Sequence, residues 1–421
     1  MSNQVPISQN TSHPSPRLNR IWMAVLLGAL AAFAPLSIDM YLPALPMISE
    51  ELGASPSVVQ LSLTFCLLGL AFGQLLAGPL SDVRGRRTPI LIGLVIYIFA
   101  SVLCAFSHSI EGFIVLRFIQ GVAGAAGIVI SRAIVRDLYS GSEMTKFFSL
   151  LALVNGIAPI FAPIAGGQVL QLFPWQGVFI VLSLIGLIML FAVFFGLRET
   201  LPAERRSESG INHTLTTFGK LMCDRDFMGY ALSQGLVYAA MFAYISGSPF
   251  VMQNVFGTTP QMYSLIFGIN GLGMIIASQT TGRLAGRVSE VKLFVIGIGI
   301  SAIGSIVLLV MILAKAGLAA VLPPLFLVVS SVGIVNTTGS SLAMKKQARS
   351  AGSASAVLGV LSMTLGGTAA PFVGLGGSNN AVPMGIIIAL ASMGSVVSYF
   401  VLVRKRKLTH NVEKSFKATD I

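Results

Sequence analysis

The sequence predicts an all-α membrane protein with about twelve transmembrane helices. Of its 421 residues, 54% are hydrophobic and only 10% are charged, whereas soluble domains carry about 25% charged residues. Apolar stretches of roughly 20 residues, the length needed to cross a bilayer core, follow one another almost from end to end. The stretches are continuous rather than alternating, which favours helices over strands because a helix satisfies every backbone group internally.

A polar N-terminal segment precedes the first apolar run. With Ala31 and Ala32 this run could be mistaken for a signal peptide, but no soluble secreted domain follows, so we expect an uncleaved helix. Short polar segments separate the later runs. The predicted spans are 22–43, 58–80, 88–107, 110–134, 146–171, 173–197, 226–253, 260–283, 290–314, 318–344, 350–375 and 380–403.

The basic residues predict the orientation of these spans. Of the 27 Lys and Arg residues, all but Arg117, inside a span, and Lys315, on the far side, fall on one side of the pattern. Because positively charged loops stay in the cytoplasm, that side is cytoplasmic and both termini lie inside. The sequence therefore predicts a multi-pass protein of the cytoplasmic (inner) membrane.

One long polar interruption divides the chain into two halves of six spans. It contains RETLPAERRSES and lies between the sixth and seventh spans. Its later part, INHTLTTFGKLMCD, is compatible with a short helix on the membrane surface or with a plain linker. The expected segments are a cytoplasmic tail at 1–20, a six-helix bundle at 21–198, a cytoplasmic linker at 199–225, a second bundle at 226–403 and a cytoplasmic tail at 404–421.

Proline and glycine positions indicate that the two halves are repeats. Similar segments, such as APIAGG and APFVGLGG, recur at separations of 204 to 208 residues. Because each half has an even number of spans, the repeats should run parallel, related by an axis along the membrane normal. The aligned pairs are Pro43 with Pro249, Gly78 with Gly282, and Pro163 with Pro371.

Composition and motif content argue against several function classes. The net charge of +12 is spread between apolar segments without interleaved aromatic residues, which argues against nucleic-acid binding. Cys66 and Cys104 lie in apolar runs and Cys223 in a charged loop, so no disulfide framework is expected. The spans contain no HExxH, no pair of carboxylates and no histidine, which argues against a membrane-embedded enzyme and a metal site.

Polar side chains recur in every third span. Asp39 lies in span one, Arg117 and Gln120 in span four, Gln234 in span seven and Asn336 in span ten. Such groups are costly in hydrocarbon, so they should face protein or a water-filled cavity. For the two carboxamides in the second half, simple hydrogen bonding between helices is an equal alternative.

A glycine-rich basic loop, GPLSDVRGRRTPI at 78–90, joins spans two and three. Gly78 and Gly85 permit a close helix approach and a tight turn. Asp82 can cap a helix or pair across the loop, and Arg86 can anchor at the headgroups. The pattern resembles the signature loop of the major facilitator superfamily, whose members are membrane transporters built from two six-helix bundles.

Spans four and five carry further resemblances to this superfamily. LRFIQGVAGAAG, at 116–127, resembles the fourth-helix motif of proton-coupled members, with Arg117 and Gln120 in their places. NGIAPIFAPIAGG, at 155–167, resembles the fifth-helix antiporter motif that marks exporters, although Ala162 stands where a glycine normally precedes the proline. Prolines and glycines bend and pack helices in any membrane protein, so the inference of export rests on the resemblance.

Two more segments resemble one branch of the superfamily. PLSIDMYLPALP, at 35–46, and RAIVRDLYSG, at 132–141, are similar to the Bcr/CflA drug-resistance branch, whose members export bicyclomycin, chloramphenicol-type or other small compounds. The resemblance implies an exporter of small amphipathic compounds, coupled to protons, with no cofactor, working as a monomer in membrane lipid. An importer or metabolite carrier of the same fold is the alternative.

Asp39 is the expected proton carrier, because the other acidic residues lie in loops, tails or at helix ends. Related exporters carry a second acid eight residues earlier, but Ala31 occupies that position here, which puts coupling by two carboxylates in doubt. Arg117 should hydrogen-bond polar groups of spans one or four and tune Asp39.

The remaining site predictions concern substrate binding and conformational change. Asp82 and Arg136 lie at facing cytoplasmic ends, where they should contact oppositely charged groups or helix ends. The residues expected to line the cavity are Tyr41, Gln120, Asn155, Gln234, Tyr238, Phe242 and Asn336. The expected conformational switch comprises Gly78, Asp82, Gly85, Arg86, Arg136, Pro159, Pro163, Gly166 and Gly167.

Overall fold

The computed structural model describes residues 17–206, 219, 221–345, 347 and 351–404, and within these ranges the chain is helical without a β-strand. Twelve helices in the described ranges are long and apolar enough to cross a membrane. The predicted all-α membrane fold is confirmed. Most of both predicted tails and the middle of the linker lie outside the described residues, as do Lys346 and Arg349 of the orientation argument.

The first six spans are formed by residues up to Gly196. Span one is assembled from α1 (Arg17–Ala31), α2 (Phe33–Asp39), the 3₁₀ turn η1 (Leu42–Ala44) and α3 (Leu45–Glu51). The other five are α4 (Pro56–Arg84), α5 (Arg87–Ala105), α6 (Ile110–Leu138), α7 (Gly141–Leu172) and α8 (Gln176–Gly196).

The second six spans begin after the linker. They are α10 (Arg225–Phe250) with the π turn η3 (Val251–Val255), α11 (Pro260–Leu284), α12 (Glu290–Leu313), α13 (Leu318–Met344), α14 (Ala351–Val373) with η5 (Gly374–Gly376), and α15 (Val382–Tyr399) with η6 (Phe400–Arg404).

Span one was expected to be a single helix, and the structure breaks it twice. Each break has a proline four residues later: α1 ends at Ala31 before Pro35, and α2 ends at Asp39 before Pro43. A proline has no N–H, so the carbonyl four residues earlier has no helical donor and the helix is weakened there. Asp39 therefore lies at a break in the membrane-spanning backbone.

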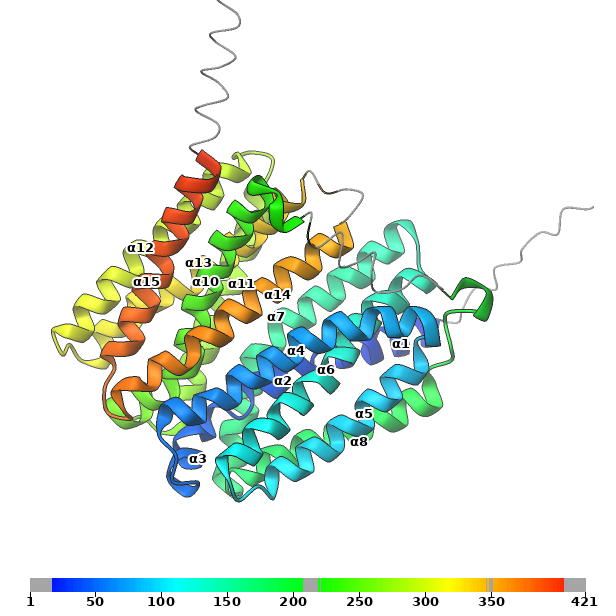
Figure 1. Cartoon of the computed structure of the whole chain (residues 1–421), viewed down its shortest axis with the longest axis horizontal. Helices are drawn as coiled ribbons and strands as arrows, with labels where there is room; N and C mark the ends of the chain where they lie inside the picture. The colour runs from blue at the N-terminus through cyan, green and yellow to red at the C-terminus, as the bar shows by residue number, and fades with distance from the viewer. Residues whose placement is uncertain (1–16, 207–218, 220, 346, 348–350, 405–421) are drawn as a thin grey trace, which may run out of the picture.

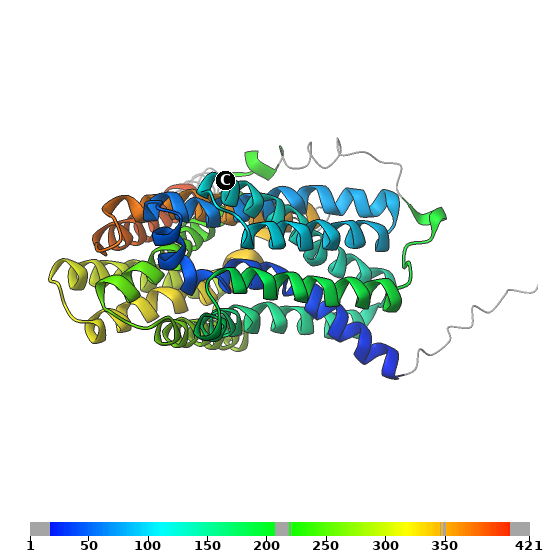
Figure 2. The same ribbon diagram turned by 90° about the horizontal axis from the view of Figure 1, so that it is seen from below.

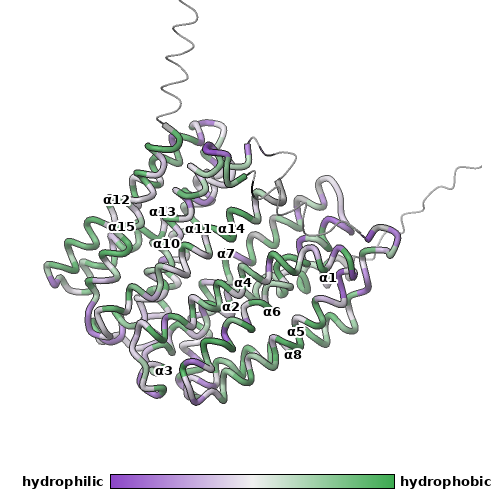
Figure 3. Tube along the Cα trace, viewed as in Figure 1, coloured by the Kyte–Doolittle hydropathy of each residue, from purple (hydrophilic) through white to green (hydrophobic). Residues whose placement is uncertain are grey.

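The two groups of six spans form two bundles side by side, α1 to α8 at the right of Figure 1 and α10 to α15 at the left. Figure 2, turned by 90°, shows the same separation. The bundles meet chiefly where α4 packs against α14 and where α7 packs against α11. Hydrophobic residues dominate along the helices, and hydrophilic residues gather towards their ends (Figure 3).

The structure supports the predicted repeat with a contact made in both bundles. In the first, Gly121 of α6 lies against the backbone carbonyl of Cys66 in α4. In the second, Gly333 of α13 lies against the carbonyl of Met274 in α11. A Cβ at either glycine would collide with that backbone, so both bundles need a residue without a side chain at this crossing.

Two ends of the molecule are distinguished below. The basic end comprises the chain segments 84–87, 138–141, 196–206, 284–290 and residue 345. The opposite end comprises the segments 51–56, 105–110, 172–176, 255–260, 313–318 and 376–382.

Candidate functional site

Arg117 of α6 is fully buried inside the first bundle. Its Nη2 donates to the backbone carbonyl of Ser37 at 2.7 Å, and its Nη1 donates to Oε1 of Gln120. The guanidinium also lies 4.1 Å from the centre of the Tyr41 ring, a cation–π arrangement. The predicted hydrogen bonds to spans one and four are thus present, and the Ser37 carbonyl is free to accept because the helix breaks two residues later.

Three hydroxyl groups extend this network to α5. Gln120 Nε2 donates to Ser101 Oγ at 2.7 Å, and the hydroxyls of Tyr97 and Ser37 lie 2.8 Å apart. Each bond restrains the orientation of a group that holds Arg117. Nothing in the sequence singled out Tyr97 or Ser101, because single hydroxyl groups in an apolar span are common.

Asp39 is 4% exposed and closes α2 at the break in span one. Among the described residues, no hydrogen bond or ion pair reaches its carboxyl group, and Arg117 contacts Ser37 instead. Tyr244 and Tyr263 of the second bundle lie near enough that an ionised Asp39 would act on them electrostatically. Asp39 is therefore a buried, unpaired carboxyl group at the boundary between the bundles.

The predicted cavity residues of the first bundle differ in exposure. Tyr41 and Gln120 are fully buried, so neither lines open surface in this conformation. Asn155 is partly exposed, and its Nδ2 donates to the Leu151 carbonyl of its own helix at 2.8 Å. Their part in substrate binding stays a prediction.

In the second bundle, Gln234 and Asn336 are hydrogen-bonded to each other. Gln234 is buried, and its Nε2 donates to Asn336 Oδ1 at 3.0 Å. Asn336 is itself exposed and Tyr238 is partly exposed, whereas Phe242 is buried against Gly366. The amide pair thus links α10 to α13, and Asn336 still presents polar surface.

Six side-chain hydrogen bonds join the two bundles in the half of the spans nearer the opposite end, and every acceptor is a backbone carbonyl. One further bond between the bundles, from Gln74 Nε2 to Met363 Sδ (3.5 Å), lies nearer the basic end. Within the basic end itself, no hydrogen bond or ion pair between the bundles joins the described residues. The contacts therefore close the opposite end. The six bonds are Ser57 to Pro371 (2.7 Å), Gln60 to Ser246 (3.0 Å), Thr64 to Gly367 (2.7 Å), Gln253 to Pro43 (3.1 Å), Gln261 to Gly167 (2.9 Å) and Ser264 to Pro163 (2.8 Å).

The predicted switch residues of α7 take part in this closure. Pro163 and Gly167 supply carbonyls to α11, and Gly166 lies against the Met40 carbonyl at the break in span one. Pro159 lies inside α7. Three glutamines and three hydroxyl residues that the sequence did not single out supply the donors.

The bond from Thr64 has a specific origin in α14. Pro371 lacks an N–H, which leaves the Gly367 carbonyl without its helical donor, and the Thr64 hydroxyl donates to that carbonyl at 2.7 Å. A buried carbonyl without a partner costs about 1–3 kcal/mol. The closed opposite end is therefore stabilised by a group that only the other bundle satisfies.

We expect Thr64→Val to shift the protein towards conformations with an open opposite end by about tenfold, since that carbonyl then loses its donor. Pulsed electron paramagnetic resonance between spin labels at Ser55 and Asn379, in a Cys223→Ser background, should show a larger population at long distance. The matched control is Thr338→Val, because the buried Thr338 hydroxyl donates within its own helix, to Ile334 at 2.7 Å. Equal distance distributions in the two variants would contradict the assignment.

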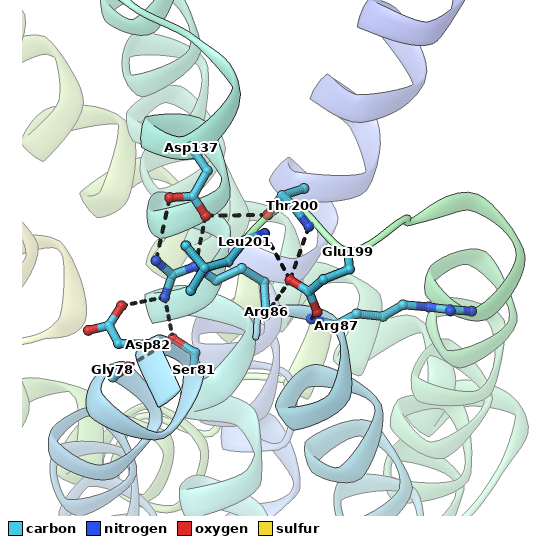
Figure 4. Close-up of polar contacts among 9 residues, drawn as sticks. All are labelled: Gly78, Ser81, Asp82, Arg86, Arg87, Asp137, Glu199, Thr200 and Leu201. Atoms are coloured by element: carbon cyan, nitrogen blue, oxygen red, sulfur yellow. Dashed lines mark hydrogen bonds and ion pairs between the residues drawn. The ribbon is translucent and has the colours of Figure 1, made fainter. Parts of the chain in front are cut away.

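At the basic end, Arg86 is the centre of a charge cluster (Figure 4). Its Nη1 lies 2.6 Å from Asp82 Oδ1 and 2.8 Å from Ser81 Oγ. Its Nε lies 2.8 Å from Oδ2 of Asp137, the last acidic residue of α6. Arg86 thereby ties the end of α4 to the end of α6.

The predicted contact of Asp82 is thus present, but Arg136 does not take part. Arg136 is exposed and has no hydrogen bond or ion pair with a described residue, whereas its neighbour Asp137 binds Arg86. Consecutive helical residues point about 100° apart, and the sequence did not show which one faces the loop.

Gly85 adopts a positive φ of 87°, as the predicted tight turn requires. A Cβ on Gly78 would meet only ordinary van der Waals contact, so the predicted close helix approach does not need that glycine.

We expect Asp82→Asn to slow transport several-fold while the protein stays in the membrane, because an ion pair with a half-exposed partner adds little to stability. Initial transport rates, normalised to protein in the membrane, provide the measurement. Glu111→Gln, at an exposed site of the opposite end, is the control. Wild-type turnover in Asp82→Asn would remove this carboxylate from the transport cycle.

No group of three His, Cys, Asp or Glu side chains in the described ranges could hold a metal ion. The candidate site therefore consists of a buried carboxyl group, a buried guanidinium, polar side chains at the bundle boundary and the charge cluster of the basic end.

Comparison with proteins of known structure supports this architecture. A bacterial homologue of the human lysosomal transporter Spinster, in an inward-facing and occupied conformation, matches with a TM-score of 0.72 and 15% identity over 93% of this chain and 98% of that one. The xylose transporter XylE from E. coli matches with a TM-score of 0.69 and 12% identity over 89% and 96%. At these identities the likeness shows the fold alone.

Relatives in sequence are closer. The chain is 44% identical to the uncharacterized MFS-type transporter YdgK of Bacillus subtilis over 92% of this chain and 96% of that protein. It is 29% identical to a bicyclomycin resistance protein homologue of Haemophilus influenzae over 90% and 95%. It is 32% identical to the multidrug resistance protein MdtL of Klebsiella pneumoniae over 60% and 64%.

The family model of the Major Facilitator Superfamily matches residues 27–371. With these relatives, the match makes the protein a multi-pass membrane transporter rather than an enzyme. The chain belongs to the Major Facilitator Superfamily, in its branch of bicyclomycin and multidrug resistance proteins.

Proposed function

We propose that this transporter exports small amphipathic, drug-like compounds across the cytoplasmic (inner) membrane in exchange for protons. The names of the bicyclomycin and multidrug resistance relatives support the substrate class. The basic end would face the cytoplasm, since it carries the positively charged segments. The bundles would rock about their shared boundary so that the site opens to one side at a time.

The observation that carries proton coupling is the state of Asp39. An ionised carboxylate that is buried without a partner is costly, so the group would stay neutral by holding a proton until a change of surroundings stabilises its charge. Rocking of the bundles would provide that change, because Tyr244 and Tyr263 lie across the boundary. No cofactor other than the proton is needed for this cycle.

Arg117 would hold the local charge balance. Its guanidinium stays ionised: Nη2 and Nη1 donate to one carbonyl and one amide oxygen, and the rings of Tyr41 and Phe179 lie beside it, while the buried Nε has no hydrogen-bond partner among the described residues. Because Asp39 is two residues from the Ser37 carbonyl, a small change in span one would move the carboxyl group relative to this fixed positive charge. The proton affinity of Asp39 would then depend on conformation.

In the described conformation, the closed opposite end leaves the basic end as the side from which a compound would reach the boundary. Asn155, Tyr238 and Asn336 have exposed surface and would contact it first. Tyr41, Gln120, Gln234 and Phe242 would join the binding surface only when the bundles move. We propose that one copy of the chain, embedded in lipid, completes this cycle.

A resistance screen tests the substrate class. An efflux-deficient host that expresses the protein should tolerate higher concentrations of one or more of bicyclomycin, chloramphenicol and ethidium. The compound whose tolerated concentration rises most with expression is then followed in inverted membrane vesicles under an imposed pH gradient. An exporter accumulates it there. An importer or metabolite carrier of the same fold would give no resistance and would exchange labelled compound in the opposite direction.

A further inference from the structure

The start of the linker is bound to the loop between α4 and α5 by one carboxylate. Glu199 Oε1 accepts from the backbone N–H of Arg86 at 2.8 Å, and its Oε2 accepts from that of Arg87 at 3.1 Å. The same Oε1 accepts from the backbone N–H groups of Thr200 and Leu201, each at 3.0 Å. Figure 4 shows this carboxylate between the loop and the linker.

The Glu199 carboxylate supplies the N-terminal cap that α5 does not receive from a neighbouring residue. The residue before the helix, Arg86, has no side chain that caps the first turn. The N–H groups at the start of a helix have no partner within it, and they favour an anion there. Glu199, which lies 113 residues further along the chain, caps the helix in place of a neighbouring residue.

The same contact gives a second reason for glycine at position 85. A Cβ at Gly85 would lie 2.5 Å from Glu199 Oε2, in addition to the strain of a φ of 87°. The loop thus bends around the glutamate, and the side chain of Thr200 adds a bond of 3.3 Å to Asp137 Oδ2. Residues 199–201 touch both the backbone and the acidic partner of Arg86.

We propose that Glu199 is a positioning residue for transport: with Thr200 it clasps the linker to the first bundle and holds Arg86 where it bridges Asp82 and Asp137. The backbone of Arg86 is fixed by Glu199 while its side chain reaches both carboxylates. The half-exposed Asp82 is on α4, which packs against α14 of the other bundle. The clasp therefore sets the position of the Asp82 carboxylate relative to the second bundle when the basic end closes.

The clasp should not respond to pH near neutrality. Burial alone would raise the pKa of the Glu199 carboxyl, but the four backbone N–H donors outweigh it and lower the pKa below its ordinary value. A group with a lowered pKa contributes its stabilisation above its unfolded-state pKa and loses it only as the pH falls through the lowered value. Between pH 6 and pH 8, Glu199 therefore stays ionised, unlike a group that carries the transported proton.

Trypsin cleavage tests the clasp without any transport assay. Arg198 is exposed, but the clasp immobilises the chain that follows it, so cleavage after Arg198 should be slow in the wild type. In Glu199→Gln, which replaces one acceptor oxygen with a donor, we expect cleavage there to be about tenfold faster. Cleavage after the exposed Arg287, between α11 and α12, provides the internal reference, and Glu204→Gln, an exposed acid of the same linker, is the matched control. Equal rates after Arg198 in wild type and Glu199→Gln would overturn the clasp.

A double-mutant cycle tests the action through Arg86, and its transport assay rests on the proposed function. We expect Glu199→Gln to slow transport about fivefold, by the same factor from pH 6 to pH 8, and to add nothing in an Asp82→Asn background. Losses that multiply in the double variant, or a loss that varies with pH, would overturn the positioning role. If Glu199→Gln does not reach the membrane, Thr200→Val, which removes only the hydroxyl bonded to Asp137, enters the same cycle. A wild type that transports nothing would count against the proposed function and leave the proteolysis result to decide on the clasp.

Discussion

Asp39→Asn should abolish accumulation driven by a pH gradient while leaving exchange of the compound intact. In inverted vesicles, uptake under an imposed pH gradient is expected to fall to that of vesicles without the protein. Counterflow of labelled against unlabelled compound, which needs no proton movement, should stay within about twofold of the wild type. Asparagine matches the shape of a protonated aspartate but cannot release a proton, so one function is lost and the other is kept.

The structure predicts that this variant folds. Asp39 makes no hydrogen bond or ion pair with a described residue, so the substitution leaves no described partner unsatisfied. The control is Glu50→Gln, an exposed acid in α3 of the same span. It should behave as the wild type in both assays. An Asp39→Asn protein that still concentrates compound under a pH gradient would show that protons use another route.

The architecture was predictable because it depends on properties that neighbouring residues share. Continuous apolar runs predicted the twelve spans. The breaks in span one were within reach of the same reasoning, because Pro35 and Pro43 each remove the donor for a carbonyl four residues earlier. The predicted continuous helix at 22–43 was wrong in this respect.

The individual contacts of the site were predictable only in part. Arg117 needs hydrogen-bond partners because its charge is buried, and the helices that supply them could be predicted from their polar residues. Which residue at the end of α6 meets Arg86 depended on rotation about the helix axis, and the structure places Asp137 there instead of Arg136.

Long-range pairing explains the rest of what the sequence did not show. Glu199 binds a loop 112 and 113 residues earlier, and Thr64 donates to a carbonyl 303 residues later. Neither partner is a side chain: in both cases a backbone group is left open by a helix start or by a proline. Backbone groups are the same whatever the residue type, so no sequence motif marks the donor or acceptor that will be used.

Arg117→Lys should slow transport by about tenfold or more although it keeps a positive charge. The guanidinium reaches the Ser37 carbonyl and Gln120 with different nitrogens while its plane lies over Tyr41. A lysine is a compact point charge that cannot hold all three in this geometry. A hydrogen bond to a charged group contributes about 1.5–3 kcal/mol, so losing one of them accounts for the expected factor. Initial rates normalised to protein in the membrane measure the loss.

The pH dependence of that loss separates charge balance from simple packing. A buried lysine gives up its proton far more readily than an arginine, so the positive charge beside span one would disappear as the pH rises. The ratio of wild-type to Arg117→Lys rates should therefore grow between pH 6 and pH 8.5. Arg136→Lys, an exposed arginine of the same helix without a described partner, should show a ratio near one at every pH. A constant ratio for Arg117→Lys would mean that the arginine only packs in the interior and donates hydrogen bonds there. Wild-type rates at every pH would mean that transport does not need the several N–H donors of its guanidinium.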